Sequence, residues 1–504
     1  MLLEVLSEIF TLGNLLMMNI GIAAGIMIGA LPGLNVVFAI AILLPLTFGM
    51  ESIAGMYLML GSYCGAVYGG SITAIMFNTP GTPAACATLF DGYPLHQQGR
   101  TADALKAALV GSAVGGIVSA LSLLFFAPTL ARASLHFQAP EYFVLCIFGL
   151  ATVIGIAGKQ VIKGVVMATL GLIISTVGID SIEGTQRLMF GDFRLMAGLK
   201  PVPVLLGIFA LSEILFKAEE IFKNTNNDQP DVIVKLKKAT IRTIDILKHW
   251  KTLLFSSIYG IIIGAIPGTG GVISAMFSYN DAKRRSKEPE KFGTGCIEGV
   301  IAPECGNNAT TGATLIPLLT FGIPGDASVA VLLGALNMQG ISPGLSLFSS
   351  GNSWVYSIMG GMLLINIFMW IQGHFLTAAF AQFSRVPKIV LLPIIMILCV
   401  VGSYSLSGAA FDVLVMIVAG LFGFVMKKLN MPISPLIIGM VLGSLMEVNL
   451  RRALVMSNGS ISIFFTRPIC AIFLLISVVC LFYPVISKAT AKLKKAKWPD
   501  SGIE

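Results

Sequence analysis

Residues 104–127 read ALKAALVGSAVGGIVSALSLLFFA, and this stretch decides the class of fold because Lys106 is its single charged side chain. A helix needs about 20 apolar residues to cross a bilayer, and this stretch supplies them. The pattern predicts repeated membrane crossings, because further blocks with almost no Asp, Glu, Lys or Arg occur at residues 142–157, 161–179, 355–381, 408–426 and 461–487.

The composition of the whole chain agrees with this pattern. The 504 residues are 56% hydrophobic and only 12% charged, whereas soluble domains average roughly 25% charged residues. About 17 apolar blocks can be distinguished, and some are too short to span a bilayer alone. We therefore expect an all-α integral membrane protein with about 12 transmembrane helices plus re-entrant or broken half-helices. The first residues lack Lys and Arg, so we expect no cleaved signal peptide.

The charged residues gather between the apolar blocks. The longest polar stretch is 217–251, a second basic loop is 281–291, and the tail at 488–497 is also basic. Cytoplasmic loops of membrane proteins are enriched in Lys and Arg, so these three segments are predicted to face the cytoplasm. The net charge of +8 is explained by this distribution and does not indicate a nucleic-acid partner.

The two halves of the chain resemble each other. Residues 28–33 read IGALPG and residues 263–268 read IGAIPG, and two later landmarks recur in the same order. Internal duplication is common in secondary transporters, where broken helices often form the site between the repeats. The predicted organisation is a first membrane repeat at 1–216, a charged cytoplasmic linker at 217–250, a second repeat at 251–460, and an extra C-terminal helix with a basic tail at 461–504.

Loop charges indicate how the repeats are oriented. The basic loop 281–291 corresponds to 48–52, which has neither Lys nor Arg, and the loop holding Arg100 and Lys106 corresponds to the uncharged segment 339–353. Both comparisons place equivalent loops on opposite faces of the membrane. A third pair of corresponding loops, 187–200 and the segment at Lys427 and Lys428, is basic in both halves and argues against inversion. The balance favours an inverted repeat.

Proline and glycine interrupt the apolar stretches at matched places in the two halves. Proline removes a helix hydrogen bond, and glycine permits non-helical backbone. Backbone freed at membrane depth is tolerated where protein buries it or water reaches it. The richest interruptions are NTPGTP at 78–83, PGTGG at 267–271, GNNATTG at 306–312 and GIPGD at 322–326. Their repetition predicts a binding site.

These interruptions contain small, hydroxylated and amide residues but no Lys or Arg. Their backbone N–H groups suit an anion at a helix N-terminus, and their carbonyls, hydroxyls and amides suit a hard cation such as Na⁺. The alternative for the amides is hydrogen bonding between helices. The predicted substrate- or ion-binding residues are Pro32, Gly33, Asn35, Ser71, Asn78, Thr79, Pro80, Gly81, Thr82, Pro267, Gly268, Thr269, Gly270, Asn307, Asn308, Thr311, Pro324, Gly325 and Asp326.

Ionisable residues beside the apolar blocks are further candidates. Glu304 lies just before the paired asparagines. Glu447 precedes Arg451 at helical i+4 spacing, which favours a structural ion pair. Asp326 has a second interpretation as a helix N-cap. Enzyme motifs are missing: the chain has no GxxxxGK[ST] loop, no HExxH and no GxSxG. The sequence therefore predicts no enzyme, no resident cofactor and no intrinsic ATP hydrolysis.

At these motifs the sequence resembles the TctA family, the large membrane subunits of tripartite tricarboxylate transporters. The resemblance covers nearly the whole chain. Three positions, Asn35, Gly306 and Leu345, depart from residues that are common in the family and leave the identity of the substrate open. The motifs that carry the resemblance are GALPGL at 29–34, GDF at 191–193 with the stretch to Glu213, GAIPG at 264–268, FGTG at 292–295, EGVIAPE at 298–304, NNA at 307–309 and GIPG at 322–325.

The resemblance implies a multi-pass protein of the bacterial inner membrane. It implies two partners, a small membrane subunit of about four transmembrane helices and a periplasmic substrate-binding protein that delivers a carboxylate such as citrate. It also implies symport driven by a Na⁺ or H⁺ gradient. The alternatives are a channel, a permease subunit of another energy-coupling class, and a membrane enzyme.

Overall fold

A computed structural model describes residues 2–31, 34–156, 160–180, 182–223, 239–348, 353–383 and 388–497. The chain forms two compact units. Unit one comprises Met1–Ser134 and Lys200–Val425, and unit two comprises Leu135–Leu199 and Met426–Glu504. Each unit therefore contains segments of both predicted repeats.

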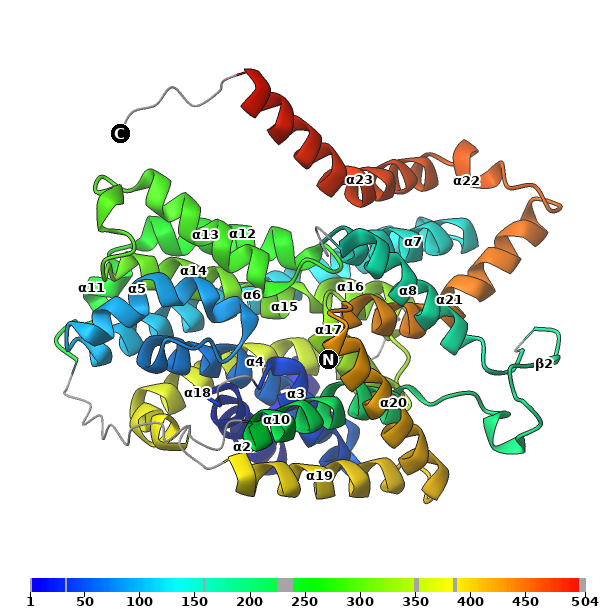
Figure 1. Cartoon of the computed structure of the whole chain (residues 1–504), viewed down its shortest axis with the longest axis horizontal. Coiled ribbons are helices and arrows are strands. Elements are labelled where there is room, and N and C mark those ends of the chain that lie inside the picture. The colour runs from blue at the N-terminus through cyan, green and yellow to red at the C-terminus, as the bar shows by residue number, and fades with distance from the viewer. Residues whose placement is uncertain are drawn as a thin grey trace. The chain divides into compact units, whose positions relative to one another are not determined.

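Unit one is built from helices of very different length, several of them interrupted (Figure 1). Its α-helices are α1 (Leu2–Ile9), α2 (Leu12–Gly29), α3 (Val36–Leu43), α4 (Ser52–Phe77), α5 (Cys86–Gln97), α6 (Thr101–Ala133), α9 (Pro201–Leu205), α10 (Ser212–Lys223), α11 (Thr243–Leu247), α12 (Trp250–Ala265), α13 (Gly270–Arg285), α14 (Glu298–Asn308), α15 (Thr310–Ala313), α16 (Leu315–Phe321), α17 (Ala327–Met338), α18 (Ser353–Phe383), α19 (Lys388–Ser405) and α20 (Ala410–Lys428).

Unit two contains α7 (Ala139–Ile156), α8 (Val161–Ser175), α21 (Ile433–Met456), α22 (Ile463–Thr466) and α23 (Pro468–Lys497). The strands of the described residues are β1 (Gly178–Ile179) and β2 (Gln186–Arg187), which pair as a short antiparallel ladder. Helix α21 packs against α7 and α8, and α23 packs against α7.

Membrane crossing is supported by the lengths of the helices. In the described part of the chain, seven helices are long and apolar enough to cross a bilayer: Leu12–Gly29, Ser52–Phe77, Thr101–His136, Pro201–Ile221, Ser353–Thr377, Ala410–Lys428 and Ile433–Met456. Shorter apolar helices accompany them, as at Trp250–Ala265 and Ala327–Met338. The predicted class, an all-α multi-pass membrane protein, is confirmed at this level. The number of crossings stays a prediction.

Helices α2 and α4 approach each other closely because glycines line their contact. In α2 the glycines recur every four residues at Gly21, Gly25 and Gly29. A methyl group at Gly25 would lie 2.3 Å from the carbonyl oxygen of Ser62 in α4, and one at Gly29 would lie 2.4 Å from that of Ala66. Small residues at this spacing let helix backbones touch in a membrane, and α2 packs on α4 along this row of glycines.

Helices α12 and α13 form a hairpin, side by side in Figure 1. The guanidinium of Arg285, at the end of α13, lies 4.1 Å from the ring centre of Phe255, near the start of α12. The turn between them falls at the predicted break, where Gly268 and Gly270 take positive φ values of 86° and 63°. The helix α16 likewise ends at Gly322, whose φ is 72°.

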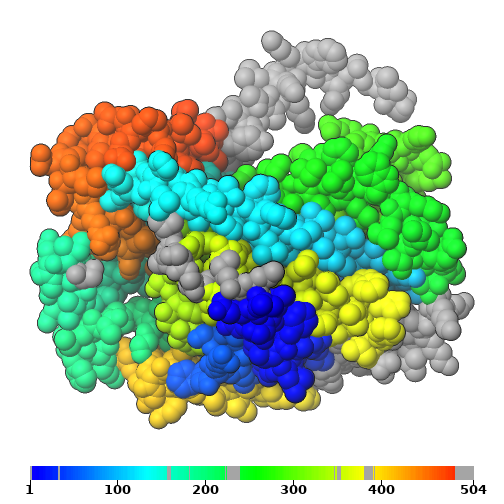
Figure 2. Space-filling model, turned by 180° about the vertical axis from the view of Figure 1, so that it is seen from behind, coloured from blue at the N-terminus to red at the C-terminus, as the bar shows by residue number. Residues whose placement is uncertain are grey.

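Segments of the two predicted repeats interlock within unit one. Helix α6 of the first half packs against α12 and α14 of the second half, and α18 of the second half packs against α2 and α4 of the first. Figure 2 shows the first residues in dark blue beside α18 in yellow. Helix α1 packs against α18, and the hydroxyl of Ser357 in α18 donates to the carboxylate of Glu8 in α1 at 2.5 Å. This interlocking brings the interrupted segments of both halves into one unit.

Candidate substrate and ion site

The first predicted break ends at a capped helix. Pro32 and Gly33 lie outside the described residues. Asn35 is the N-cap of α3, and its side-chain oxygen accepts the backbone N–H of Phe38 at 2.9 Å. An N-cap residue satisfies a backbone donor that the helix leaves unpaired. The side-chain oxygen of Asn35 is therefore engaged locally.

The second break, after α4, starts at the surface. Asn78 is exposed and takes the left-handed conformation that ends α4. Thr79 is also exposed, and its hydroxyl donates to the nearby carbonyl of Phe77 at 3.1 Å. Pro80 is half-buried. This end of the segment makes local contacts.

The same break enters the core one residue later. Gly81 is buried and donates its N–H to the carbonyl of Gly70 at 3.2 Å. A methyl group at Gly81 would lie 2.2 Å from the carbonyl of Gly29, so only glycine fits between α2 and α4. Thr82 is 2% exposed, and its hydroxyl has no hydrogen-bond partner within the described residues.

The two breaks of the second half meet each other. The N–H of Gly268 donates to the carbonyl of Gly325 at 2.5 Å. Pro267 and Pro324 beside them are both buried. A methyl group at Gly270 would lie 3.7 Å from the Cβ of Asp326. The structure therefore brings 267–270 and 324–326 together, and their role in a shared site stays a prediction.

Asp326 and Thr269 in these breaks also form hydrogen bonds with nearby backbone groups. Asp326 is the N-cap of α17 and accepts the N–H of Val329 at 2.8 Å, as its second interpretation predicted. The hydroxyl of Thr269 donates to the carbonyls of Ile263 and Ile266 at the end of α12.

The paired asparagines lie in the core at the end of α14. Asn307 is 2% exposed and Asn308 is fully buried. The amide nitrogen of Asn308 donates to the backbone carbonyl of Glu304 at 3.0 Å, and Thr311 donates its hydroxyl to the carbonyl of Asn308 at 2.8 Å. A methyl group at Gly271 would lie 2.2 Å from the side-chain oxygen of Asn307, so the backbone of the break at 267–271 packs directly on this amide.

Both amides keep an unused polar atom. The Nδ2 of Asn307 and the Oδ1 of Asn308 are buried without a hydrogen-bond partner among the described residues. A buried donor or acceptor without a partner costs about 1–3 kcal/mol, and native structures contain few of them. One is a donor suited to an anion, and the other is an acceptor suited to a cation.

A buried carboxylate lies one turn before these amides. Glu304 is 1% exposed. It accepts the hydroxyl of Thr88 from α5 at 2.5 Å and that of Ser112 from α6 at 2.9 Å, and the Ser71 hydroxyl of α4 lies beside it. The sequence indicated Glu304 and Ser71 but missed Thr88 and Ser112. A lone Thr or Ser in an apolar helix gives no signal of its own, because such hydroxyls most often bond within their helix.

A second buried carboxylate, Asp91 of α5, also escaped sequence analysis. Its Oδ1 accepts the backbone N–H groups of Gly293, Gly295 and Cys296 at 2.9, 2.9 and 2.7 Å. Its Oδ2 accepts the hydroxyl of Tyr279 at 2.9 Å. Gly293 and Gly295 have φ values of 93° and 105°. These values let the backbone of the FGTG motif at 292–295 curve so that its N–H groups point at this carboxylate.

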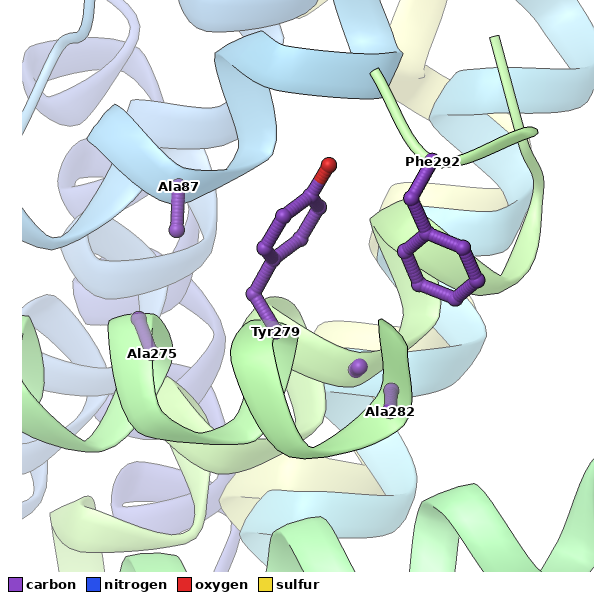
Figure 3. Close-up of a cluster of buried hydrophobic side chains, with 6 residues drawn as sticks. Ala87, Ala275, Tyr279, Ala282 and Phe292 are labelled. Atoms are coloured by element: carbon purple, nitrogen blue, oxygen red, sulfur yellow. The ribbon is translucent and has the colours of Figure 1, made fainter. Parts of the chain in front are cut away.

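Figure 3 shows the apolar side of this arrangement. Tyr279 rises from α13 between Ala87 of α5 and Phe292, with Ala275 and Ala282 below it. The rings of Tyr279 and Phe292 meet edge to face at 5.6 Å. The cluster joins α5 of the first half to the loop that precedes α14.

Charged residues of unit two form a separate network. Arg451 contacts Glu447 at 3.0 Å, confirming the predicted ion pair, and contacts Asp180 at 2.9 Å. Arg187 also pairs with Asp180. Hydrogen bonding from the N–H of Ile182, and then from Arg187, outweighs burial and lowers the pKa of Asp180 to about 2. These fixed pairs indicate a structural role.

Comparison with known proteins gives a consistent result. The model of the tripartite tricarboxylate transporter TctA family matches residues 15–438. An uncharacterised 52.8 kDa protein in the TAR-I ttuC' 3' region of Agrobacterium vitis is 36% identical over 96% of this chain and 95% of its own length. A second uncharacterised A. vitis protein, in the TAR-II ttuC' 3' region, is 36% identical over 46% of this chain and 96% of its own length. No solved structure matches the chain.

Proposed function

The chain belongs to the tripartite tricarboxylate transporter TctA family, and from this membership we propose that it imports tricarboxylates or related carboxylates by ion-gradient-driven symport. The observation that carries the proposal is the pair of buried amides, Asn307 and Asn308, each with an unpaired polar atom. They lie against a broken helix hairpin, through the contact of Asn307 with Gly271. Broken helices form the substrate and ion sites of many secondary transporters.

The arrangement suits an anion and a cation bound together. The unpaired amide nitrogen of Asn307 offers a hydrogen bond to a carboxylate oxygen, and the unpaired oxygen of Asn308 offers a ligand to Na⁺. An isolated charge in apolar surroundings is costly, so a co-bound cation would lower the cost of burying the carboxylate. Na⁺ or H⁺ is the proposed coupling ion, and no resident cofactor takes part.

The lack of fixed positive charge favours turnover. None of the interrupted segments at 78–83, 267–271, 306–312 and 322–326 contains Lys or Arg. A buried Arg or Lys would hold a carboxylate by a strong, charge-assisted bond. A site of amides, hydroxyls and backbone groups releases its anion when the coupling ion leaves.

The exchange of helix contacts between halves supports an alternating-access mechanism. Helices α6 and α18 occupy corresponding places in the two predicted repeats, and each packs on the early helices of the other half. In transporters with inverted repeats, movement of one repeat against the other opens the site to alternate sides. We extend the proposal to an inverted repeat in this chain.

Family membership also carries the proposed partners and location. The tripartite architecture requires partner subunits, and we assign these as a small membrane subunit of about four transmembrane helices and a periplasmic binding protein. The proposed location is the bacterial inner membrane. The binding protein captures the carboxylate, and the membrane subunits move it into the cell.

An uptake screen tests the proposal. The complex is reconstituted in vesicles with its binding protein, and radiolabelled di- and tricarboxylates, citrate among them, are offered with and without a Na⁺ or proton gradient. Saturable accumulation of one carboxylate that requires a gradient is expected. Unsaturable flux would indicate a channel, and uptake that requires ATP and is blocked by orthovanadate would indicate a permease of another class.

A further inference from the structure

Glu304 is a buried carboxylate surrounded by hydroxyl groups. It lies in α14 of the second half, and the Thr88 and Ser112 hydroxyls that donate to it come from the first half. Thr88 of α5 donates to Oε1 at 2.5 Å, and Ser112 of α6 donates to Oε2 at 2.9 Å. With 1% exposure, the carboxylate is removed from bulk water.

No positive charge of the described residues compensates this carboxylate. The partners of Glu304 are hydroxyls, and the titratable groups that face it are the phenol of Tyr68 in α4 and the neighbouring thiol of Cys305. Both groups are neutral at neutral pH. An unpaired buried carboxylate is costly unless a proton or a metal cation neutralises it.

We infer that Glu304, with Thr88 and Ser112, binds the monovalent cation, H⁺ or Na⁺, whose gradient drives uptake. The inference rests on the proposed function and deepens it. For Na⁺, the carboxylate and hydroxyl oxygens are hard ligands of the kind that such cations prefer. For a proton, one carboxylate oxygen becomes a donor and a neighbouring hydroxyl turns to accept from it.

The position of Glu304 explains how the cation would act on the substrate. Its backbone carbonyl accepts the amide nitrogen of Asn308 at 3.0 Å, one helical turn away. The oxygen of that amide is left unpaired. A cation bound at Glu304 neutralises the carboxylate that lies between α14 and helices α5 and α6. It therefore stabilises the packing of these helices, which come from both halves and hold the asparagines in place.

Neutralisation of Glu304 tests the inference. Glu304→Gln keeps the size of the side chain but cannot carry a proton or offer a charge to Na⁺. In the reconstituted complex we expect at least a tenfold loss of gradient-driven accumulation, measured separately with a Na⁺ and with a proton gradient. Exchange of labelled for unlabelled substrate at equal concentrations needs no net cation movement and should continue.

Glu298→Gln is the matched control. Glu298 lies in the same helix and also accepts a threonine hydroxyl, that of Thr252, but it is half-buried and faces His249 at 3.7 Å. This variant should accumulate substrate like the wild type. Equal loss in both variants would show that any carboxylate change in α14 is harmful, which would overturn the inference.

A second variant serves if Glu304→Gln is poorly folded. Thr88→Val removes one hydroxyl and preserves the shape, and it should raise the concentration of Na⁺ or H⁺ that gives half-maximal uptake about tenfold, with maximal uptake kept. An unchanged cation dependence would overturn the inference. Normal accumulation by Glu304→Gln would overturn the cation site at Glu304 and leave the proposed function standing. A wild-type complex that accumulates no carboxylate would overturn the proposed function as well.

Discussion

The carboxylate of Asp91 accepts the backbone N–H of Gly295 at 2.9 Å across 204 residues of sequence. Gly293 and Cys296 donate to the same oxygen, so three backbone dipoles converge on one charge. The bond joins α5 of the first predicted repeat to the loop before α14 of the second. The FGTG motif at 292–295 thus has a physical explanation, because its two glycines adopt the positive φ values that bring their N–H groups to this carboxylate.

Removal of the carboxylate should destabilise the protein. Asp91→Ala leaves three N–H groups and the Tyr279 hydroxyl without their acceptor. Hydrogen bonds to charged groups contribute about 1.5–3 kcal/mol each, and unpaired buried donors add to the cost. We expect a clearly lower midpoint of thermal unfolding in detergent. Tyr279→Phe, which removes one of the four bonds, should have a smaller effect. An unchanged midpoint for Asp91→Ala would contradict this role.

The close contact between α2 and α4 should depend on Gly25. Its substitution by alanine would place a methyl group 2.3 Å from the carbonyl of Ser62, so the helices must separate. Overpacking of this kind costs about 1–3 kcal/mol. Gly13→Ala in the same helix meets no atom within 4 Å and is the matched control. Thermal unfolding should distinguish them, and equal midpoints would show that the contact tolerates a wider spacing.

Much of the fold follows from the sequence, and the reason is local chemistry. The Pro267-Gly268 step predicts a break inside an apolar stretch, and α12 ends at Ala265. Asn35 directly precedes an apolar run, a position typical of an N-cap, and it caps α3. Its predicted role in binding stays a prediction. Residues directly before or after a helix, such as these, decide where the helix begins and ends, so helix ends can be predicted from local sequence. The number of membrane crossings is harder to predict from the sequence, because helices such as α17 are shorter than a full bilayer span and their length does not show whether they cross.

The site is predictable only in part, since its partners come from distant segments. Asn307 and Asn308 stand out as amides in an apolar region, and the structure finds them buried with unpaired atoms. Thr88 and Ser112 do not stand out, and their role depends on the packing of α5 and α6 against α14. Asp91 is an ordinary acidic residue in a helix of mixed polarity. Its importance is visible only when a loop about 200 residues later surrounds it.

The loop 281–291 and the linker 217–251 should lie on the cytoplasmic side of the membrane. Both are rich in Lys and Arg, as cytoplasmic loops are, and Arg285 at the end of α13 lies over the ring of Phe255 near the start of α12, as a hairpin requires. Ser286→Cys in a variant without other reactive thiols should be labelled by an impermeant reagent only when the cytoplasmic face is accessible. Labelling from the periplasmic face would contradict this orientation.

Asn308 should contribute directly to ligand affinity. Asn308→Ala removes a buried amide and should cost about 1–3 kcal/mol of binding free energy, or roughly a ten- to hundredfold loss of affinity for substrate or ion. Asn308→Leu should be worse, because it also fills the space. Ser286→Ala, in the basic loop, should transport normally. Wild-type affinities in a well-expressed Asn307→Ala, Asn308→Ala double variant would show that the pair only packs helices.

The source of energy is the most direct test of the account. Uptake of the carboxylate is measured in cells or vesicles with ATP kept intact while ionophores collapse the Na⁺ and proton gradients together. The chain carries no phosphate-binding loop of the GxxxxGK[ST] type, and its buried amides and carboxylate suit ions. We predict that uptake stops when both gradients are gone. Continued accumulation under these conditions would contradict the assignment as a secondary transporter.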